Sequence, residues 1–348
     1  WSIYDTVESR VVPVVFGLIF VIGLVGNGTL IISVLANKVM RNVPNILIAS
    51  LSLGDFLLIL VSVPMTSVLY TFVGWPFGIV GCKLDQYMQT LSLGVSVFTL
   101  TALSADRYVA IVNPMAKLTG CTQRTTIGIA LAIWLLSALL AIHDAVVSTE
   151  DTVELFNVTH TFCANIPTSM GPLYSQIAYA TRFVIFFLLP LLIIGFFYVM
   201  MARMLIRSNE NVPTESKTGA ANHHRQIAAR KKVARVVLSF VIIFIICWLP
   251  RHIFQLWYYF DTSDFNEFWH VFKITGFCLQ FINSCVNPFA LYFLSGQFRK
   301  YYNRYLFCCC RRVRYSSLES NSAMHSLHST NRRSSPTNMS LLHSQSMC

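Results

Sequence analysis

Residues 100–114, LTALSADRYVAIVNP, contain the stretch of sequence that decides the fold. A long apolar segment ends here in an acid and a base, Asp106 and Arg107, and Tyr108 follows before the run stops at Pro114. Charged side chains at membrane depth are costly, and where they are retained they usually have a function. We therefore interpret this stretch as the end of a membrane helix that carries a functional ion pair.

The composition of the whole chain is that of a protein that crosses the bilayer several times. Of its 348 residues, 55% are hydrophobic and 12% are charged, whereas a soluble domain carries about 25% charged residues. One crossing needs roughly 20 mainly apolar residues, and the segments of that kind are 12–36, 44–70, 83–112, 125–142, 176–206, 233–259 and 268–294. The sequence therefore predicts an all-α membrane protein, a bundle of seven transmembrane helices.

The distribution of charge predicts how this bundle is oriented. Acids without bases occupy the connections on one side, at Asp144, Glu150, Asp151, Glu154, Asp261, Asp264 and Glu267. Bases gather on the other side, at Lys38, Arg41, Lys117, Arg124, Arg207, Lys217, Arg225, Arg230, Lys231, Lys232, Arg299, Lys300, Arg304, Arg311, Arg312 and Arg314. Because positively charged loops stay in the cytoplasm, we expect a plasma-membrane protein with its N-terminus outside and its C-terminus inside. The net charge of +11 then reflects topology and does not indicate nucleic-acid binding.

These segments divide the chain into three parts. Residues 1–11 are expected to form an extracellular segment, residues 12–307 the membrane domain, and residues 308–348 a disordered cytoplasmic tail with few apolar anchors. Residues 296–307 alternate aromatic and basic side chains, which is typical of a short amphipathic helix on the inner membrane surface. The chain begins at Trp1 rather than at a methionine, and we expect a further segment upstream.

Several side chains are candidates for covalent modification. Cys82 and Cys163 both fall on the outer side by this topology, where an oxidising environment suits a disulfide. Asn157 begins an Asn-Val-Thr glycosylation sequence in the same outer loop. Cysteines next to a basic patch after the last span are candidates for palmitoylation, with unmodified thiols as the alternative. These cysteines are Cys308, Cys309 and Cys310.

Polar side chains occur near the middle of four predicted helices. They are Asn27, Asp55, Ser96, Asn283, Ser284 and Asn287. A lone carboxylate inside the membrane is normally paired or lines a wet cavity. The group could hold Asp55 ionised around an allosteric sodium ion with oxygen ligands, and an interhelical hydrogen-bond network is the alternative. No other cofactor or metal is expected.

Three prolines lie inside the predicted fifth, sixth and seventh helices. Each of Pro190, Pro250 and Pro288 removes a helix hydrogen bond and favours a kink. Trp248 lies two residues before Pro250, which places a bulky side chain beside a hinge. Kinked helices around a polar core predict an element with two conformations.

The ordered set of these motifs resembles the rhodopsin-like G-protein-coupled receptors. One motif lies on each span: Gly26-Asn27, Leu53-Gly54-Asp55, Cys82 with Asp106-Arg107-Tyr108, Trp134, Pro190 with Tyr198, Cys247-Trp248-Leu249-Pro250, and Asn287-Pro288. Residues 6–10 (TVESR), 40–45 (MRNVPN), 94–108 and 283–292 (NSCVNPFALY) are similar to the bombesin-type peptide receptors, and most of all to their invertebrate relatives, the CCHamide receptors.

This resemblance implies a receptor and not an enzyme. The expected ligand is an extracellular amidated neuropeptide, with a bombesin-like, endothelin-like or other peptide as the alternative. The expected partners are a heterotrimeric G protein, of the Gq class with calcium signalling, and arrestin and receptor kinases at the tail. A shift of the helix bundle toward the conformer that binds the peptide more tightly would transmit the signal.

The resemblance also implies roles for individual residues. Asp106 would hold Arg107 at rest and release it toward Tyr198 and the G protein on activation. Trp248 would form a relay below the pocket with Phe244, Pro190 and Val97. The implied switch residues are Asp106, Arg107, Tyr108, Tyr198, Phe244, Trp248, Pro250, Asn287, Pro288 and Tyr292. The implied ligand-binding residues are Gln89, Asp85, Asp144, Arg182, Arg251, His252, Gln255 and Phe277. Arg182 and Arg251 would bind a peptide carbonyl or acid or pair with Asp85; an internal pairing without ligand contact is the alternative.

The sequence departs from the family pattern at several positions. Tyr292 lies one place later than in most of the superfamily, a shift that the bombesin group shares. Arg230 stands where the usual acid partner of Arg107 would be, so we expect higher basal activity than in a receptor with both restraints. Phe277 and Tyr258 replace arginines of the vertebrate bombesin receptors, so bombesin itself should bind poorly.

Other functions fit the sequence less well. An opsin needs a lysine where Phe281 stands, and an aminergic receptor needs an acid where Gln89 stands. A transporter or channel could use Asp55 and a polar midline, but no internal repeat is present. The hydrolase motifs H-E-x-x-H and G-x-S-x-G do not occur.

Overall fold

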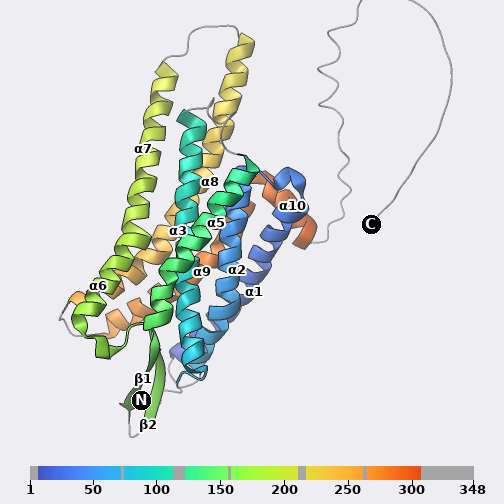
Figure 1. Ribbon diagram of the computed structural model, residues 1–348. Coiled ribbons are helices and arrows are strands. Elements are labelled where there is room, and N and C mark those ends of the chain that lie inside the picture. Colours follow the sequence, from blue (N-terminus) through green and yellow to red (C-terminus); the bar gives the residue numbers. More distant parts are fainter. Residues whose placement is uncertain are drawn as a thin grey trace, which may run out of the picture. The chain divides into compact units, whose positions relative to one another are not determined.

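The computed structural model describes residues 7–71, 74–112, 122–155, 158–210, 217–261 and 265–306. Within these ranges, seven helical segments are long and apolar enough to cross a membrane (Figure 1). They are formed by α1 (Val7–Ala36), α2 (Val43–Thr71), α3 (Gly78–Val112), α5 (Gln123–Val147), α6 (Pro172–Phe183) continuing through α7 (Leu189–Glu210), α8 (Lys217–Phe260) and α9 (Glu267–Leu294). The predicted bundle of seven membrane helices is therefore present.

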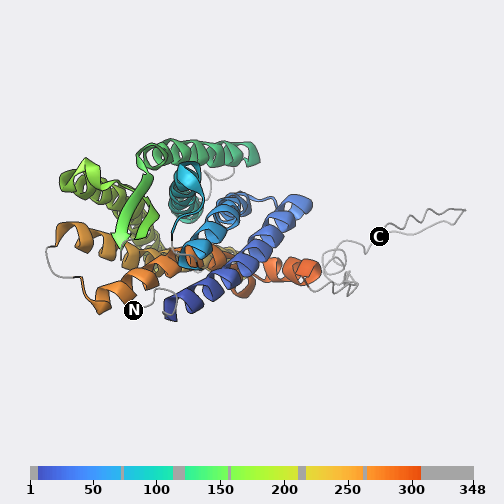
Figure 2. The ribbon, with the colours of Figure 1, turned by 90° about the horizontal axis from the view of Figure 1, so that it is seen from below.

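Helix α3 lies inside the bundle. It packs against α2, α5, α7 and α8, and the view along the bundle shows it enclosed by neighbouring helices (Figure 2). Most of its residues from Met88 to Leu100 are buried, including polar ones. This position explains why a helix of moderate hydropathy carries so many Ser, Thr and Gln side chains: they face protein and not lipid.

Two glycines permit close helix contacts. A Cβ atom at Gly94 of α3 would lie 2.8 Å from Ser137 Oγ of α5, and one at Gly276 of α9 would lie 3.0 Å from the backbone nitrogen of Arg251 in α8. Membrane helices commonly use small residues in this way, because close packing replaces the hydrophobic driving force that lipid cannot supply. Both contacts bring pocket-lining helices together.

The fifth span is not one continuous α-helix. Residues Val184–Leu188 form a π-helical segment, η4, between α6 and α7, and it ends two residues before Pro190. The sequence predicted a proline kink here, and the structure adds a local widening of the helix. Such widened turns are frequent at functional sites. They point side chains in directions that differ from those in a regular α-helix.

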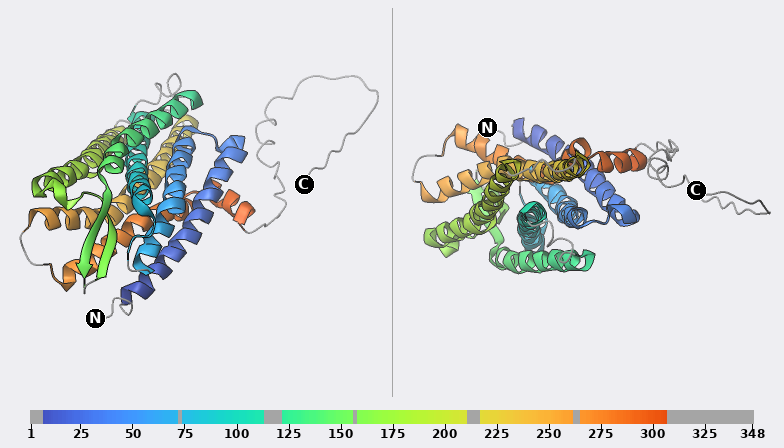
Figure 3. Two further views of the ribbon diagram at one scale, coloured as in Figure 1. Left: turned by 60° about the horizontal axis from the view of Figure 1, so that its bottom comes forward. Right: turned by 90° about the horizontal axis from the view of Figure 1, so that it is seen from above.

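A β-hairpin, which sequence analysis missed, covers one end of the bundle. Strands β1 (Thr149–Leu155) and β2 (Val158–Ala164) pair antiparallel and lie near the start of α1, at what we call the hairpin end (Figure 3). The predicted disulfide between Cys82 and Cys163 is confirmed and ties β2 to α3. Asp144, which the sequence placed among the outer loop acids, lies instead in the last turn of α5 and is buried, so that assignment was wrong.

The predicted short helix after the seventh span is present as α10 (Gly296–Leu306) at the opposite end, which we call the α10 end. Phe298 and Tyr302 are buried against the bundle, whereas Arg299 and Lys300 are exposed. The Tyr302 hydroxyl donates to the Gly26 carbonyl of α1 at 3.4 Å, and burial raises its pKa. Asn157, Cys308, Cys309, Cys310 and the tail lie outside the described residues, so these predictions stay untested.

Candidate ligand-binding pocket and switch residues

A central cavity of about 500 Å³ lies at the hairpin end between α3, α6, α8, α9 and β2. It brings together every predicted ligand-binding residue except Asp144, namely Asp85, Gln89, Arg182, Arg251, His252, Gln255 and Phe277. These residues come from four helices that are distant in sequence. Their convergence at one end of a bundle is the usual arrangement of a ligand pocket between membrane helices.

Several lining residues were not singled out from the sequence. They include Trp75, Phe162, Tyr179, Tyr259, Lys273 and Gln280. Lys273 and Gln280 are spaced by four and three residues from Phe277 and therefore share its helix face. That spacing was a usable signal for these two residues. Phe162 lies on the hairpin that sequence analysis missed.

A chain of side-chain hydrogen bonds joins α3 to α9 in the wall of the central cavity. The Gln280 amide donates to Gln89 Oε1 at 2.8 Å, and the Gln89 amide donates to Asp85 Oδ2 at 2.9 Å. All three side chains are buried. The second carboxylate oxygen of Asp85 has no hydrogen-bond partner among the described residues. A buried acceptor of this kind can receive a donor from a ligand.

His252 connects the central cavity to the aromatic core below it. Its side chain is 2% exposed, and its ring centroid lies 5.0 Å from that of Phe187 and 6.1 Å from that of Trp248. Trp248 in turn packs against Phe244 at 6.0 Å, and both belong to the same buried cluster as Val97. Three of the residues that the resemblance placed in a relay below the pocket, Val97, Phe244 and Trp248, therefore lie in one buried cluster.

The positive charges of the two pocket arginines, Arg251 and Arg182, have different neighbours. Arg251 lies over the Phe277 ring, with 5.4 Å between its guanidinium carbon and the ring centroid, a favourable cation–π geometry. Arg182 forms an ion pair with Asp144 at 3.0 Å. The sequence had suggested Asp85 as an internal acid partner; the acid that the structure places on Arg182 is Asp144.

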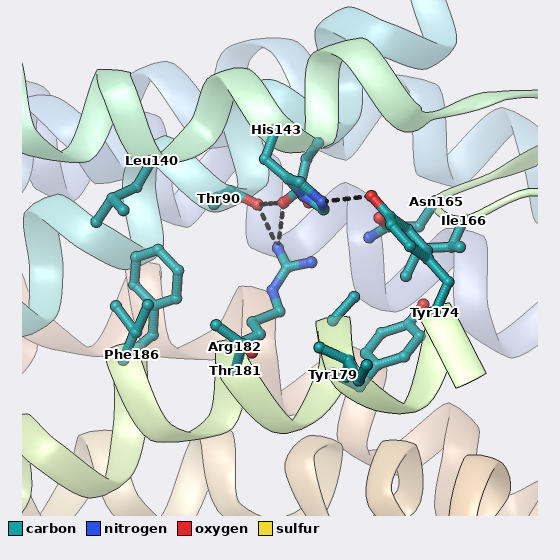
Figure 4. A pocket seen from close by; sticks show the side chains of 14 residues that line it. Thr90, Leu140, His143, Asn165, Ile166, Tyr174, Tyr179, Thr181, Arg182 and Phe186 are labelled. Carbon is teal, nitrogen blue, oxygen red and sulfur yellow. Dashed lines mark hydrogen bonds and ion pairs between the residues drawn. The ribbon is translucent and has the colours of Figure 1, made fainter. Parts of the chain in front are cut away.

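Asp144 lines a separate side cavity of about 320 Å³ between α3, α5 and α6 (Figure 4). The Thr90 hydroxyl donates to its Oδ2, and His143 Nδ1 lies 3.1 Å from its Oδ1. His143 Nε2 lies 2.9 Å from the Tyr174 hydroxyl. Arg182 lines both this cavity and the central one.

The structure brings the mid-depth polar residues together. The Asn27 amide donates to the Ser284 carbonyl at 2.8 Å, and the Asn287 amide donates to Asp55 Oδ2 at 2.8 Å. Ser96 and Ser284 also interact with the Asp55 side chain. Asn283 is buried as well. Asp55 Oδ1 has no hydrogen-bond partner in the part of the chain that the structure describes, so the hydrogen-bond network leaves one oxygen for a further ligand.

At the α10 end, Arg107 contacts the neighbouring Asp106 carboxylate, as the resemblance implied. The Tyr198 hydroxyl donates to the Ala234 carbonyl at 2.9 Å, which joins α7 to α8. Tyr108 packs on Phe197 with 5.3 Å between ring centroids. The Tyr292 hydroxyl donates to Asn303 Oδ1 of α10 at 3.2 Å. Pro250 and Pro288 lie inside α8 and α9, and the side chain of Arg230 lies outside the described residues.

This fold and this arrangement of motifs define a class of membrane receptor. Residues 26–292 match the family described as 7 transmembrane receptor (rhodopsin family). The chain belongs to this family, which confirms the predicted seven-span, multi-pass membrane architecture and the expectation of a receptor and not an enzyme.

Two individual members of this family are similar to the chain over most of its length. The chain is 45% identical over 309 residues to the Neuropeptide CCHamide-1 receptor of Drosophila melanogaster, an alignment that covers 86% of this chain and 61% of that protein. It is 40% identical over 301 residues to Bombesin receptor subtype-3 of Ovis aries, covering 85% and 74%. The chain thus spans about three fifths of the length of the first relative.

Proposed function

We propose that this chain is a plasma-membrane receptor for an amidated, CCHamide-like neuropeptide. The single observation that carries the proposal is the central cavity, because it places hydrogen-bonding and charged groups from four helices directly above the aromatic core around Trp248. The similarity to a neuropeptide CCHamide-1 receptor at 45% identity supports the ligand class. The hairpin end would then face outward and the α10 end the cytoplasm.

A population shift would carry the signal from one end to the other. A peptide that binds more tightly when His252 and Trp248 repack would favour the conformer in which α8 moves at the α10 end. Raising the active fraction of receptors from about 1% to about 99% requires about 5.5 kcal/mol of differential affinity between the two conformers. Contacts in the central cavity that form only in the active conformer would have to supply it.

The α10 end offers a site for the G protein. Arg107, held by Asp106, and Tyr198, held on α8, are the groups that would rearrange. A cavity of about 230 Å³ lined by Ile111, Tyr198, Met201 and Arg235 lies beside them, between α3, α7 and α8. We propose a heterotrimeric G protein of the Gq class with calcium signalling here, and arrestin and receptor kinases at the tail.

The polar group around Asp55 fits an allosteric sodium ion. The unpaired carboxylate oxygen and the nearby Ser96 hydroxyl are hard oxygen ligands of the kind that a small cation prefers. A bound ion would compensate a carboxylate that is fully buried and would favour the packing of α2, α3 and α9 seen here.

Intracellular calcium in cells that express this chain tests the proposal. We expect a response to a CCHamide-type amidated peptide, a weaker one to bombesin, and loss of both in Arg107→Ala at equal surface expression. Equal potency of bombesin-type peptides would favour the second candidate, a bombesin-like ligand, which the 40% relative supports. Silence to all peptides, with the receptor displayed at the cell surface, would contradict the proposed ligand class.

A further inference from the structure

A largely buried ion pair between Arg182 and Asp144 lies where the central cavity and the side cavity adjoin. Arg182 lines both, whereas Asp144 lines only the side cavity. The guanidinium lies 3.0 Å from Asp144 Oδ2, and 15% of the Arg182 side chain and 8% of the Asp144 side chain are exposed. The central cavity therefore contains an arginine whose charge is compensated from behind, by an acid outside the cavity wall.

Asp144 is held in place by groups other than Arg182. Thr90 donates to one of its oxygens, and His143, itself bonded to Tyr174, contacts the other (Figure 4). Thr90 also accepts a hydrogen bond from Arg182. These contacts from α3, α5 and α6 keep the carboxylate beside the guanidinium, so an incoming ligand meets the pair and not a lone cation.

The pair favours a neutral ligand group over an anionic one. A guanidinium carries five N–H donors and can donate to an amide carbonyl while it stays paired with Asp144. A carboxylate at the same place would meet the attraction of Arg182 and the repulsion of Asp144 in a poorly hydrated site, where charge interactions are strong. Building repulsion against the wrong partner is a common source of binding specificity.

We propose that Asp144 sets the receptor's preference for an amidated over a free-acid peptide by compensating the charge of Arg182, without itself lining the central cavity. This inference rests on the proposed function and extends it to a specificity-determining residue. Asp85, Arg251 and Lys273 also line the central cavity and act on both ligand forms. The relevant quantity is therefore the change in selectivity and not the selectivity of one receptor.

The test compares one CCHamide-type peptide with its free-acid form on four receptors. These are the unsubstituted chain, Asp144→Asn, the double variant Asp144→Asn with Arg182→Gln, and Glu150→Gln. Asparagine keeps the shape of aspartate and removes its charge. The double variant removes the whole pair, so it leaves no uncompensated buried charge, and Glu150→Gln controls for loss of one negative charge on the nearby hairpin.

In Asp144→Asn we expect the ratio of free-acid to amide EC50 to fall by at least about tenfold at equal surface expression. In the double variant this fall in the ratio should not occur, because the arginine that attracts the free acid is also removed. Glu150→Gln should keep the ratio of the unsubstituted receptor. An unchanged ratio in Asp144→Asn, in a receptor that still responds to the amidated peptide, would overturn this inference and leave the proposed function standing. Silence of the unsubstituted receptor to the amidated peptide would overturn both.

Discussion

The imidazole of His252 lies with its ring centroid 6.1 Å from that of Trp248, at the boundary between the central cavity and the aromatic core. Its Nε2 atom is buried and has no hydrogen-bond partner among the described residues. A buried polar atom without a partner is costly. A ligand that supplied the partner would therefore act directly on the side chain that contacts Trp248.

His252→Phe should weaken peptide activation. Phenylalanine fills the space between Phe187 and Trp248 but cannot hydrogen bond with a ligand, and one such bond contributes about 1–1.5 kcal/mol. We expect peptide potency to fall about tenfold, measured by calcium release at matched surface expression. The thermal midpoint of the purified receptor without ligand should not fall. Unchanged potency would show that no ligand group reaches this ring.

Gln280→Leu should destabilise the unliganded receptor. It leaves the buried carbonyl oxygen of Gln89 without its donor, which costs about 1–3 kcal/mol, and a lower thermal midpoint in detergent would report this loss. Gln255→Leu is the matched control, because Gln255 lines the same cavity at 8% exposure and, among the described residues, it takes no part in the hydrogen-bond chain between α3 and α9. Equal shifts for the two variants would contradict the importance of the Asp85–Gln89–Gln280 chain.

Tyr198→Phe should raise basal signalling. The variant loses the hydrogen bond to the Ala234 carbonyl that joins α7 to α8, and about 1 kcal/mol of resting-state stabilisation corresponds to a severalfold change in the active fraction. Accumulation of inositol phosphate without ligand measures it. Tyr305→Phe removes a hydroxyl that contacts Asn37 at the same end and should leave basal signalling unchanged. A fall in basal signalling for Tyr198→Phe would contradict a resting restraint.

Sodium should stabilise the purified receptor through Asp55. An ion that binds only the folded state raises the thermal midpoint as its concentration increases. Sodium chloride should therefore raise the thermal midpoint more than potassium chloride does at equal ionic strength. Asp55→Asn should abolish the difference. An equal effect of both salts on the unsubstituted receptor would favour the plain hydrogen-bond network that the sequence left open as the alternative.

Gly94→Ala should destabilise the contact between α3 and α5. The added methyl group would lie 2.8 Å from Ser137 Oγ, and such overpacking costs about 1–3 kcal/mol. Gly195→Ala is the matched control, because no atom of the described residues outside the local helix backbone lies within 4 Å of a Cβ atom there. Its thermal midpoint should stay level or rise slightly through better helix propensity. A similar loss in both variants would contradict the packing explanation.

Much of the pocket could be predicted because its residues occupy regular positions on helices. The resemblance implied Arg251, His252 and Gln255 as ligand-binding residues, and the structure brings them to one cavity. Gln280 could have been found from its spacing to Phe277. Phe162 could not, since residues 149–164 are polar and irregular in hydropathy; the structure pairs them as a hairpin, which the disulfide ties to α3.

The sequence by itself determined the seven spans and the short helix after them, because hydrophobic length and charge distribution are properties of a single segment or of its neighbours. It also indicated the disulfide between Cys82 and Cys163, because the charge distribution places both cysteines on the outer side. Only the tertiary structure decided that Arg182 pairs with Asp144, that Gln89 joins Gln280, and that Tyr198 bonds to α8. Each of these contacts joins different helices. It depends on helix rotation and depth, which packing across the whole bundle sets and no local pattern encodes.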